Sequence, residues 1–207
     1  MKHLFLILAL MLGAVPAHAE VEVDEVTTPG GLEAWLVEDH SIPFVALEIR
    51  FRGGASLDAP EAQGATNLMV GLLEEGAADM TAQEFAKARD ALAAKFSYDV
   101  SDDAVSVSAQ MLTENRDEAA ALLRASLVAP RFDAAAIERV RGQVLSGLRS
   151  AQTDPRDLAS RAFDRLVFGD HPYGSPLEGT MDSVEALTRE DLVAAHETAL
   201  TRERVHI

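Results

Sequence analysis

The period of the hydrophobic pattern changes along this chain in a set order, and that order restricts the possible folds more than any other feature. Alternating apolar and polar residues are typical of a half-buried strand, whereas apolar spacing by three or four is typical of an amphipathic helix. The expected strands cover residues 21–27, 32–37, 44–51, 96–100, 104–112 and, as the start of a strand, 204–207. The expected helices cover residues 63–75, 81–94, 116–127, 134–151, 155–168 and 188–200. This order predicts an α+β fold in which helices cover one face of one mainly antiparallel sheet.

Local signals support these boundaries. Pro29-Gly30-Gly31 predicts the turn of a hairpin between the first two strands. Thr81 and Glu84 have the spacing of a capping box, and Pro155 suits a first helical turn. The last expected strand stops at Ile207 after only four residues. We therefore expect the chain to be a fragment of a longer protein, truncated at its C-terminal end.

The first nineteen residues have the pattern of an export signal. Lys2 precedes an apolar run from Leu4 to Leu12, and Pro16-Ala17-His18-Ala19 supplies the small residues that a signal peptidase recognises. A membrane-spanning helix needs about 20 apolar residues, roughly twice this run. We expect cleavage after Ala19 and a periplasmic domain from residue 20 to 207. No later segment is long and apolar enough to predict stable membrane insertion.

The charge balance is strongly acidic. The chain has 18 Lys and Arg against 34 Asp and Glu, a formal charge of −16, which becomes −17 when Lys2 leaves with the signal peptide. Such a surface repels nucleic acid and anionic lipid and favours solubility, or a cationic peptide or basic partner. The chain has no cysteine. An oxidising compartment therefore adds no disulfide.

Most chemistry-bearing residues have simple structural interpretations. The histidines after the signal peptide stand singly in the sequence, at His40, His171, His196 and His206. We interpret His171-Pro172-Tyr173 as a turn, His196-Glu197 as a surface pair, and Glu74-Glu75 as a solvated helix end. The chain lacks G-x-S-x-G, a phosphate-binding G-x-x-x-x-G-K-[ST] and G-x-G-x-x-G.

Four segments together resemble the insulinase/pitrilysin family of metallopeptidases. The matching segments are Gly64–Ala77, Val144–Arg149 followed by Asp154-Pro155, Leu166–Pro176 followed by Gly179-Thr180, and Leu187–Leu192. Their order and spacing resemble the N-terminal half of a family member, and they span almost all of the chain after the signal peptide. The resemblance implies the half-shell α+β domain of that family.

Active members of this family carry H-x-x-E-H on the first of these helices and a glutamate ligand on a later one. Two histidines at i and i+4 share one helix face, so both can reach one Zn²⁺, and the glutamate between them acts on the metal-bound water. By the resemblance, Asn67, Val70 and Gly71 occupy the H, E and H positions here, and Gly147, 76 residues after Gly71, occupies the later glutamate position. The resemblance therefore leaves no catalytic or metal-binding residue in this chain.

The resemblance implies a non-catalytic role. Family members enclose a chamber, and in two-subunit members one subunit carries zinc while the other supplies chamber wall and substrate contacts. We expect such a non-catalytic subunit, forming a heterodimer with a zinc-bearing homologous peptidase and binding its peptide substrates, with zinc only in that partner. The alternative is a stand-alone peptide-binding or chaperone-like protein that uses the same cleft without chemistry. A third alternative is a hydrolase with an unconventional site.

Overall fold

The computed structural model describes residues 22–207 in two compact units, Met1–His40 and Ser41–Ile207. The predicted signal peptide, residues 1–19, lies outside the described residues. The first unit contains an antiparallel hairpin of β1 (Asp24–Thr27) and β2 (Glu33–Leu36). Thr28 closes its turn, because its backbone exchanges hydrogen bonds with Leu32 and Gly31 and its hydroxyl accepts a bond from Leu32 N at 2.9 Å. The hairpin is confirmed, but it forms a separate two-stranded sheet, so the expectation of one sheet was wrong.

The second unit is built on a four-stranded antiparallel sheet in the order β6-β7-β3-β8. Its strands are β3 (Phe44–Arg52), β6 (Lys95–Val100), β7 (Ala104–Leu112) and β8 (Val205–His206). Ile49 of β3 pairs with Val107 of β7, which pairs with Tyr98 of β6, and all three face the hydrophobic core. On the other face Ser108 donates a 2.6 Å hydrogen bond to Glu48. One face is therefore apolar and covered, and the other is polar.

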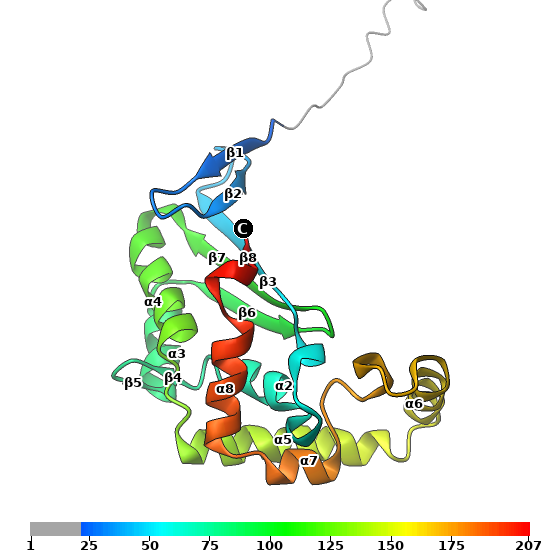
Figure 1. Ribbon diagram of the computed structural model, residues 1–207. Helices are drawn as coiled ribbons and strands as arrows, with labels where there is room; N and C mark the ends of the chain where they lie inside the picture. The colour runs from blue at the N-terminus through cyan, green and yellow to red at the C-terminus, as the bar shows by residue number, and fades with distance from the viewer. Residues whose placement is uncertain (1–21) are drawn as a thin grey trace, which may run out of the picture. The chain divides into compact units, whose positions relative to one another are not determined.

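Helices cover the apolar face of this sheet (Figure 1). The helices of the described chain are α2 (Ala65–Val70), α3 (Ala82–Ala91), α4 (Arg116–Val128), α5 (Ala134–Ala151), α6 (Pro155–Phe168), α7 (Met181–Ala186) and α8 (Arg189–Ala199), and of these α6 does not cover the sheet. Short 3-10 turns lie at Ala55–Leu57, Pro60–Ala62, Thr113–Asn115, Pro172–Gly174 and Arg202–Arg204. Buried side chains of α2, α4, α5 and α8 join those of the sheet in one core. The predicted fold class, an antiparallel sheet with helices on one face, is confirmed.

Three local predictions were wrong or incomplete. The helix expected over residues 63–75 is α-helical only from Ala65 to Val70, and residues 71–75 continue in tighter turns. A small hairpin follows, with β4 (Gly76–Ala77) paired to β5 (Met80–Thr81). The sequence reading also missed α7, which Thr180 and Ser183 open with reciprocal hydrogen bonds.

The start of α2 is held by a carboxylate from outside the helix. Asp58 accepts hydrogen bonds from the backbone of Gly64 at 2.9 Å and of Thr66 at 3.1 Å, and from the Thr66 hydroxyl at 2.5 Å. These bonds satisfy N–H groups that have no partner within a first helical turn. Burial raises the pKa of Asp58, while the hydrogen bonds oppose that shift. Asp58 therefore fixes where α2 begins.

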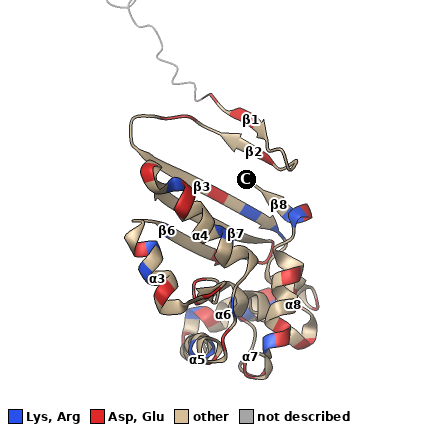
Figure 2. Cartoon of the chain, turned by 90° about the vertical axis from the view of Figure 1, so that its left-hand side faces the viewer, with Lys and Arg blue, Asp and Glu red and all other residues tan. Residues whose placement is uncertain are grey.

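The acidic residues are spread over many elements, including α3, α4 and α8 (Figure 2). Arg141 ties α5 to α7, because its guanidinium donates to the carbonyls of Val184 and Leu187, the latter at 2.9 Å. In the range 22–207, no helix is both long and apolar enough to cross a bilayer.

Candidate functional site at helices α2 and α5

The three positions of the first motif lie at α2. Asn67 is half-buried, Val70 is only 5% exposed, and Gly71 is exposed at the C-terminal end of the helix. Val70 belongs to the hydrophobic core together with Leu68 and Met69. Val70 is therefore a packed apolar side chain of the core.

Helix α2 contacts α5 through Gly71. A Cβ atom placed on Gly71 would lie 3.0 Å from Cγ1 of Val140, a buried residue of α5. That distance is tighter than ordinary van der Waals contact, so the absence of a side chain at Gly71 allows the two helices to approach here. A histidine at this position would require Val140 to move.

Gly147 lies further along α5 and is exposed. It follows Val140 by seven residues, which is almost two full turns, so it occupies the same side of the helix roughly 10 Å along the axis. A Cβ atom at Gly147 would meet no other atom within 4 Å. The structure thus puts Asn67 and Val70 on α2, Gly71 at the C-terminal end of α2, and Gly147 on α5 beside it.

The residues present at these positions do not fit a zinc ion. Zinc in proteins takes imidazole nitrogen, thiolate sulfur or carboxylate oxygen as ligands. Val70, Gly71 and Gly147 have no donor atom in their side chains, and Asn67 offers only a neutral amide. Within residues 22–207, no three His, Cys, Asp or Glu side chains gather in a group that could hold a metal.

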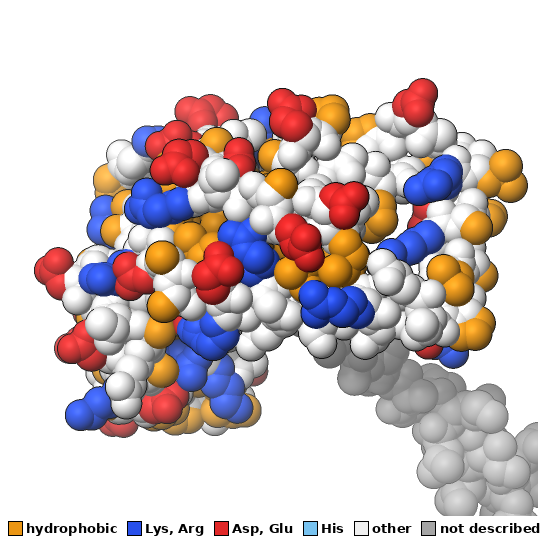
Figure 3. Space-filling model, turned by 90° about the horizontal axis from the view of Figure 1, so that it is seen from below, with side chains coloured by type: hydrophobic (Ala, Val, Ile, Leu, Met, Phe, Trp, Pro, Cys, Tyr) orange, Lys and Arg blue, Asp and Glu red, His pale blue; other side chains and the backbone are white. Residues whose placement is uncertain are grey.

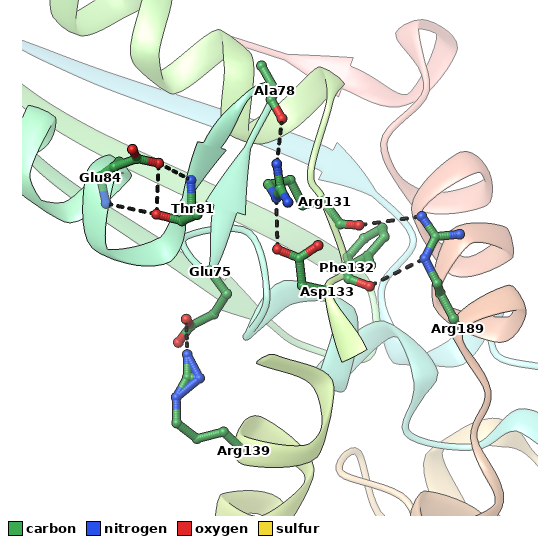
Figure 4. Close-up of polar contacts among 9 residues, drawn as sticks. All are labelled: Glu75, Ala78, Thr81, Glu84, Arg131, Phe132, Asp133, Arg139 and Arg189. Carbon is green, nitrogen blue, oxygen red and sulfur yellow. Dashed lines mark hydrogen bonds and ion pairs between the residues drawn. The ribbon is translucent and has the colours of Figure 1, made fainter. Parts of the chain in front are cut away.

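The two glutamates after α2 have partners, which corrects their interpretation as a solvated helix end. Arg89 donates a 2.8 Å hydrogen bond to Glu74. Arg139 reaches from α5 to the carboxylate of Glu75 (Figure 4). Both glutamates are half-buried. Their carboxylates therefore serve as links to α3 and α5.

Two histidines have structural roles that differ in how well the sequence predicts them. Tyr173 N donates to Nδ1 of His171 at 3.3 Å within a 3-10 turn, so the predicted turn is confirmed. His196 is not part of a surface pair with Glu197. Its Nε2 lies 2.8 Å from the carbonyl of Leu127, and its ring packs edge-on against Phe132.

A groove of about 610 Å³ lies beside Gly147, between α5 and α6. It combines apolar side chains with carboxylates, and its lining includes Val144, Gly147, Leu148, Phe168, Tyr173, Asp102, Asp157, Asp164 and Glu178. Residues of α2 do not line it. The sequence reading missed this groove, because Asp102 lies in the turn between β6 and β7, far along the chain from α5 and α6.

Carboxylates give this groove a negative potential. Burial, followed by the neighbouring charges of Asp103 and Asp164, raises the pKa of Asp102. Tyr173 donates a 2.6 Å hydrogen bond to Asp103. In the described part of the chain, neither Asp102 nor Glu178 forms an ion pair with Lys, Arg or His. The groove therefore suits an uncharged or cationic group better than an anionic one.

The antiparallel sheet, the helices on one of its faces and the adjacent helices α2 and α5 define a peptidase-like half-shell domain without its metal ligands. The chain belongs to the insulinase family, peptidase family M16, which residues 34–181 match.

Similar proteins are named either as a non-peptidase homolog or as zinc proteases. The non-peptidase homolog YmxG of Helicobacter pylori is 29% identical over 155 residues, which cover 75% of this chain and 36% of that protein. An uncharacterized zinc protease of Mycobacterium leprae is 28% identical over 181 residues, which cover 86% of this chain and 40% of that protein. The chain thus spans well under half the length of these relatives.

The fold has a close counterpart among solved structures. The crystal structure of a peptidase M16 inactive domain from Pseudomonas fluorescens superposes with a TM-score of 0.85 at 27% identity, over 90% of this chain and 45% of that chain. This likeness supports the insulinase-type fold of the whole second unit.

Proposed function

We propose that this chain is a non-catalytic domain of a periplasmic insulinase-type peptidase assembly, in which a homologous subunit supplies the zinc. The domain forms part of the chamber wall and of the surface that holds peptide substrates. The observation that carries this proposal is that the positions which the resemblance identifies with the zinc ligands have no metal-binding side chain, while the helices around them are intact. Asn67 lies on α2, Gly71 at its C-terminal end and Gly147 on α5, and α2 packs against α5.

The domain lacks metal-binding side chains at these positions, but the packing around them is intact. A degenerating fold would show loosely packed side chains in α2 or unpaired buried polar groups. Here Val70 fills its position at 5% exposure, and among the described residues no buried side-chain nitrogen or oxygen lacks a hydrogen-bond partner. An intact scaffold without metal ligands supports a role in binding and assembly. The inactive domain from Pseudomonas fluorescens, which shares this fold, is consistent with that role.

The alternative is stand-alone peptide binding without a catalytic partner. The groove beside Gly147 favours peptide contact in either case, because it offers apolar, aromatic and carboxylate side chains in one hollow. The two functions differ in whether peptide cleavage appears when a zinc-bearing homologue is added.

The test mixes the full-length protein that contains this domain with a homologue from the same cell that carries an intact H-x-x-E-H. Light scattering coupled to size-exclusion chromatography measures association, and a fluorogenic peptide measures cleavage. We expect a heterodimer, and cleavage that requires both subunits. A partner variant with Gln in place of the H-x-x-E-H glutamate should associate normally and cleave nothing, because the chemistry resides in that subunit.

Other outcomes separate the alternatives. Peptide binding by this protein, with no association and no added cleavage in the mixture, would favour the stand-alone function. Cleavage by this protein alone, retained after exhaustive treatment with chelator, would indicate an unconventional hydrolase. The proposed export has its own test, in which residues 1–19 direct a reporter enzyme to the periplasm, and retention of the reporter in the cytoplasm would contradict that part of the proposal.

A further inference from the structure

Helix α6 carries an apolar stripe that the rest of the domain does not cover. None of the fourteen residues of α6 is buried. Leu158, Phe163 and Leu166 are 50%, 61% and 85% exposed. Residues 158, 162, 163, 166 and 167 follow helical spacing, so they lie on one side of the helix. Figure 3 shows hydrophobic side chains along the outer edge of the molecule over α6.

The polar side of α6 faces the domain instead. Asp157, Ser160, Arg161 and Asp164 line the groove against α5. These residues are about opposite Leu158, Ala162 and Leu166 on the helix, because each residue advances by roughly 100°. The helix is therefore turned the opposite way from an ordinary amphipathic surface helix, whose apolar side faces the core. Contiguous apolar surface of this kind marks an interaction site.

Basic side chains flank the stripe. Arg165 follows Leu158 by seven residues and lies along one flank, and Arg156 precedes Phe163 by seven residues and lies along the other. Neither arginine forms an ion pair within residues 22–207. In a chain of net charge −16, these two exposed arginines form a local basic rim on either side of the stripe.

We propose that this surface of α6 docks an amphipathic helix of a partner whose apolar stripe is flanked by acidic residues. The apolar side chains of the two helices would pack, and the carboxylates of the partner would pair with Arg156 and Arg165. Charge complementarity of this kind selects the partner and disfavours wrong pairings. A second copy of this chain is the wrong occupant, because two α6 helices packed through this stripe would bring arginines against arginines.

The experiment uses two synthetic helical peptides of about five turns, roughly 18 residues. Both have the same leucine stripe, one with glutamates and the other with lysines along its flanks. Fluorescence anisotropy measures their binding to the full-length protein. We expect the glutamate peptide to bind at least about tenfold more tightly, with the preference decreasing as salt rises. Equal binding of the two peptides, or binding of neither, would overturn the proposal.

Variants locate the surface and control for non-specific effects. Phe163→Ser with Leu166→Ser should weaken the glutamate peptide about tenfold or more, whereas Val128→Ser on α4, equally exposed at 60%, should not. Arg156→Glu with Arg165→Glu should reverse the preference between the peptides. The matched pair Arg124→Glu and Arg202→Glu, at other exposed positions, should leave it unchanged.

Two further results would also contradict the proposal. Loss of glutamate-peptide binding in the matched Arg124 and Arg202 variant would show that net charge, and not the rim of α6, selects the peptide. A dimer of the unmodified protein that Leu166→Ser converts to monomer would show that a second copy occupies the stripe. Because all substituted side chains are exposed, unchanged circular dichroism should accompany every variant.

Discussion

Helices α5 and α6 are consecutive, similar in length and both amphipathic, yet they use their apolar sides in opposite ways. Helix α5 buries Ala136, Ile137, Val140, Leu145 and Leu148 inside the domain. Helix α6, which is separated from α5 by three residues, buries none. Amphipathicity therefore shows that a helix has an apolar contact to make, but not whether the contact lies within the same domain.

This difference implies that substitutions in the two helices should affect different properties of the protein. The packing of α5 against α2 and α7 holds Gly71 and Gly147 in place, so substitutions in this contact should act on stability. The outer side of α6 contributes little to stability, so substitutions there should act on association. The following predictions test this division.

The largest effect is expected from truncating a leucine in α5. Leu148 is 3% exposed and Leu166 is 85% exposed. Leu148→Ala should lower the free energy of unfolding by about 3 kcal/mol, because it leaves a cavity among packed side chains. Leu166→Ala should change it by less than about 0.5 kcal/mol. Urea denaturation measures both, and equal losses would show that the stripe of α6 is covered within the domain.

A smaller effect of opposite sign is expected at Gly147. Alanine is a better helix former than glycine, and a Cβ atom at Gly147 meets no other atom within 4 Å. Gly147→Ala should therefore raise the free energy of unfolding by about 0.5–1 kcal/mol. Gly71→Ala should gain less or lose stability, because its Cβ atom would press on Val140 at 3.0 Å. If both variants gain equally, the proposed close contact of α2 with α5 is incorrect.

A weaker, pH-dependent effect is expected in the groove between α5 and α6. Burial and the charges of Asp103 and Asp164 raise the pKa of Asp102 in the folded chain above its unfolded value. Protonated Asp102 therefore favours the fold at low pH, and this contribution is lost as pH rises through the folded pKa.

At neutral pH, Asp102→Asn should stabilise the chain slightly, because solvent screens the partly exposed carboxylate, and the gain should shrink as pH falls from neutral into the acidic range and Asp102 becomes protonated. The measurement is urea denaturation across this pH range. Glu197→Gln, the same change of charge at an exposed site on α8, should show no such trend. A gain from Asp102→Asn that grows at low pH would contradict the sign.

The smallest effect is expected from a chelator. Metal stabilises only a folded state that can ligate it. Since Asn67, Val70, Gly71 and Gly147 provide no ligand set, excess EDTA should leave the melting temperature unchanged. A fall of several degrees would show that metal binds elsewhere in the protein, and zinc analysis would then give the amount bound per chain.

Much of the fold could be predicted from local patterns. The alternation in residues 104–112 predicts which residues face the core, and Val105 and Val107 are both buried as that strand packs. The bounds expected for α5 and α6 agree with those observed. These predictions were accurate because both patterns are long, and because the period of the apolar residues shows which side of an element is buried.

Short elements escaped prediction. The strands of the β4–β5 hairpin have two residues each, too few to show a period. Helix α7 begins with a capping box in which Ser183 takes the place usual for Glu or Gln, so its signal is weak. The turns after Val70 lie where Gly71 contacts Val140 of α5, and the local sequence gives no information about that contact.

The candidate site was predictable only through resemblance. Asn67, Val70, Gly71 and Gly147 have no chemistry that would draw attention to them, and only the spacing of the family motif indicates their importance. The orientation of α6 was not predictable. Its period gives the stripe, but the side that faces the domain depends on how α6 packs against α5 and on the turn at Asp102, which is distant in sequence.

The bonds from Asp58 to Gly64 and Thr66 have a consequence for motion. A short helix of six residues should exchange its first amide hydrogens within local fluctuations. Here those amides are tied to a side chain of the preceding loop, so releasing them requires the loop to open as well. Helix α2 and the loop before it should therefore form one cooperative unit, in which the amides of Gly64 and Thr66 exchange with deuterium as slowly as those of the core strands.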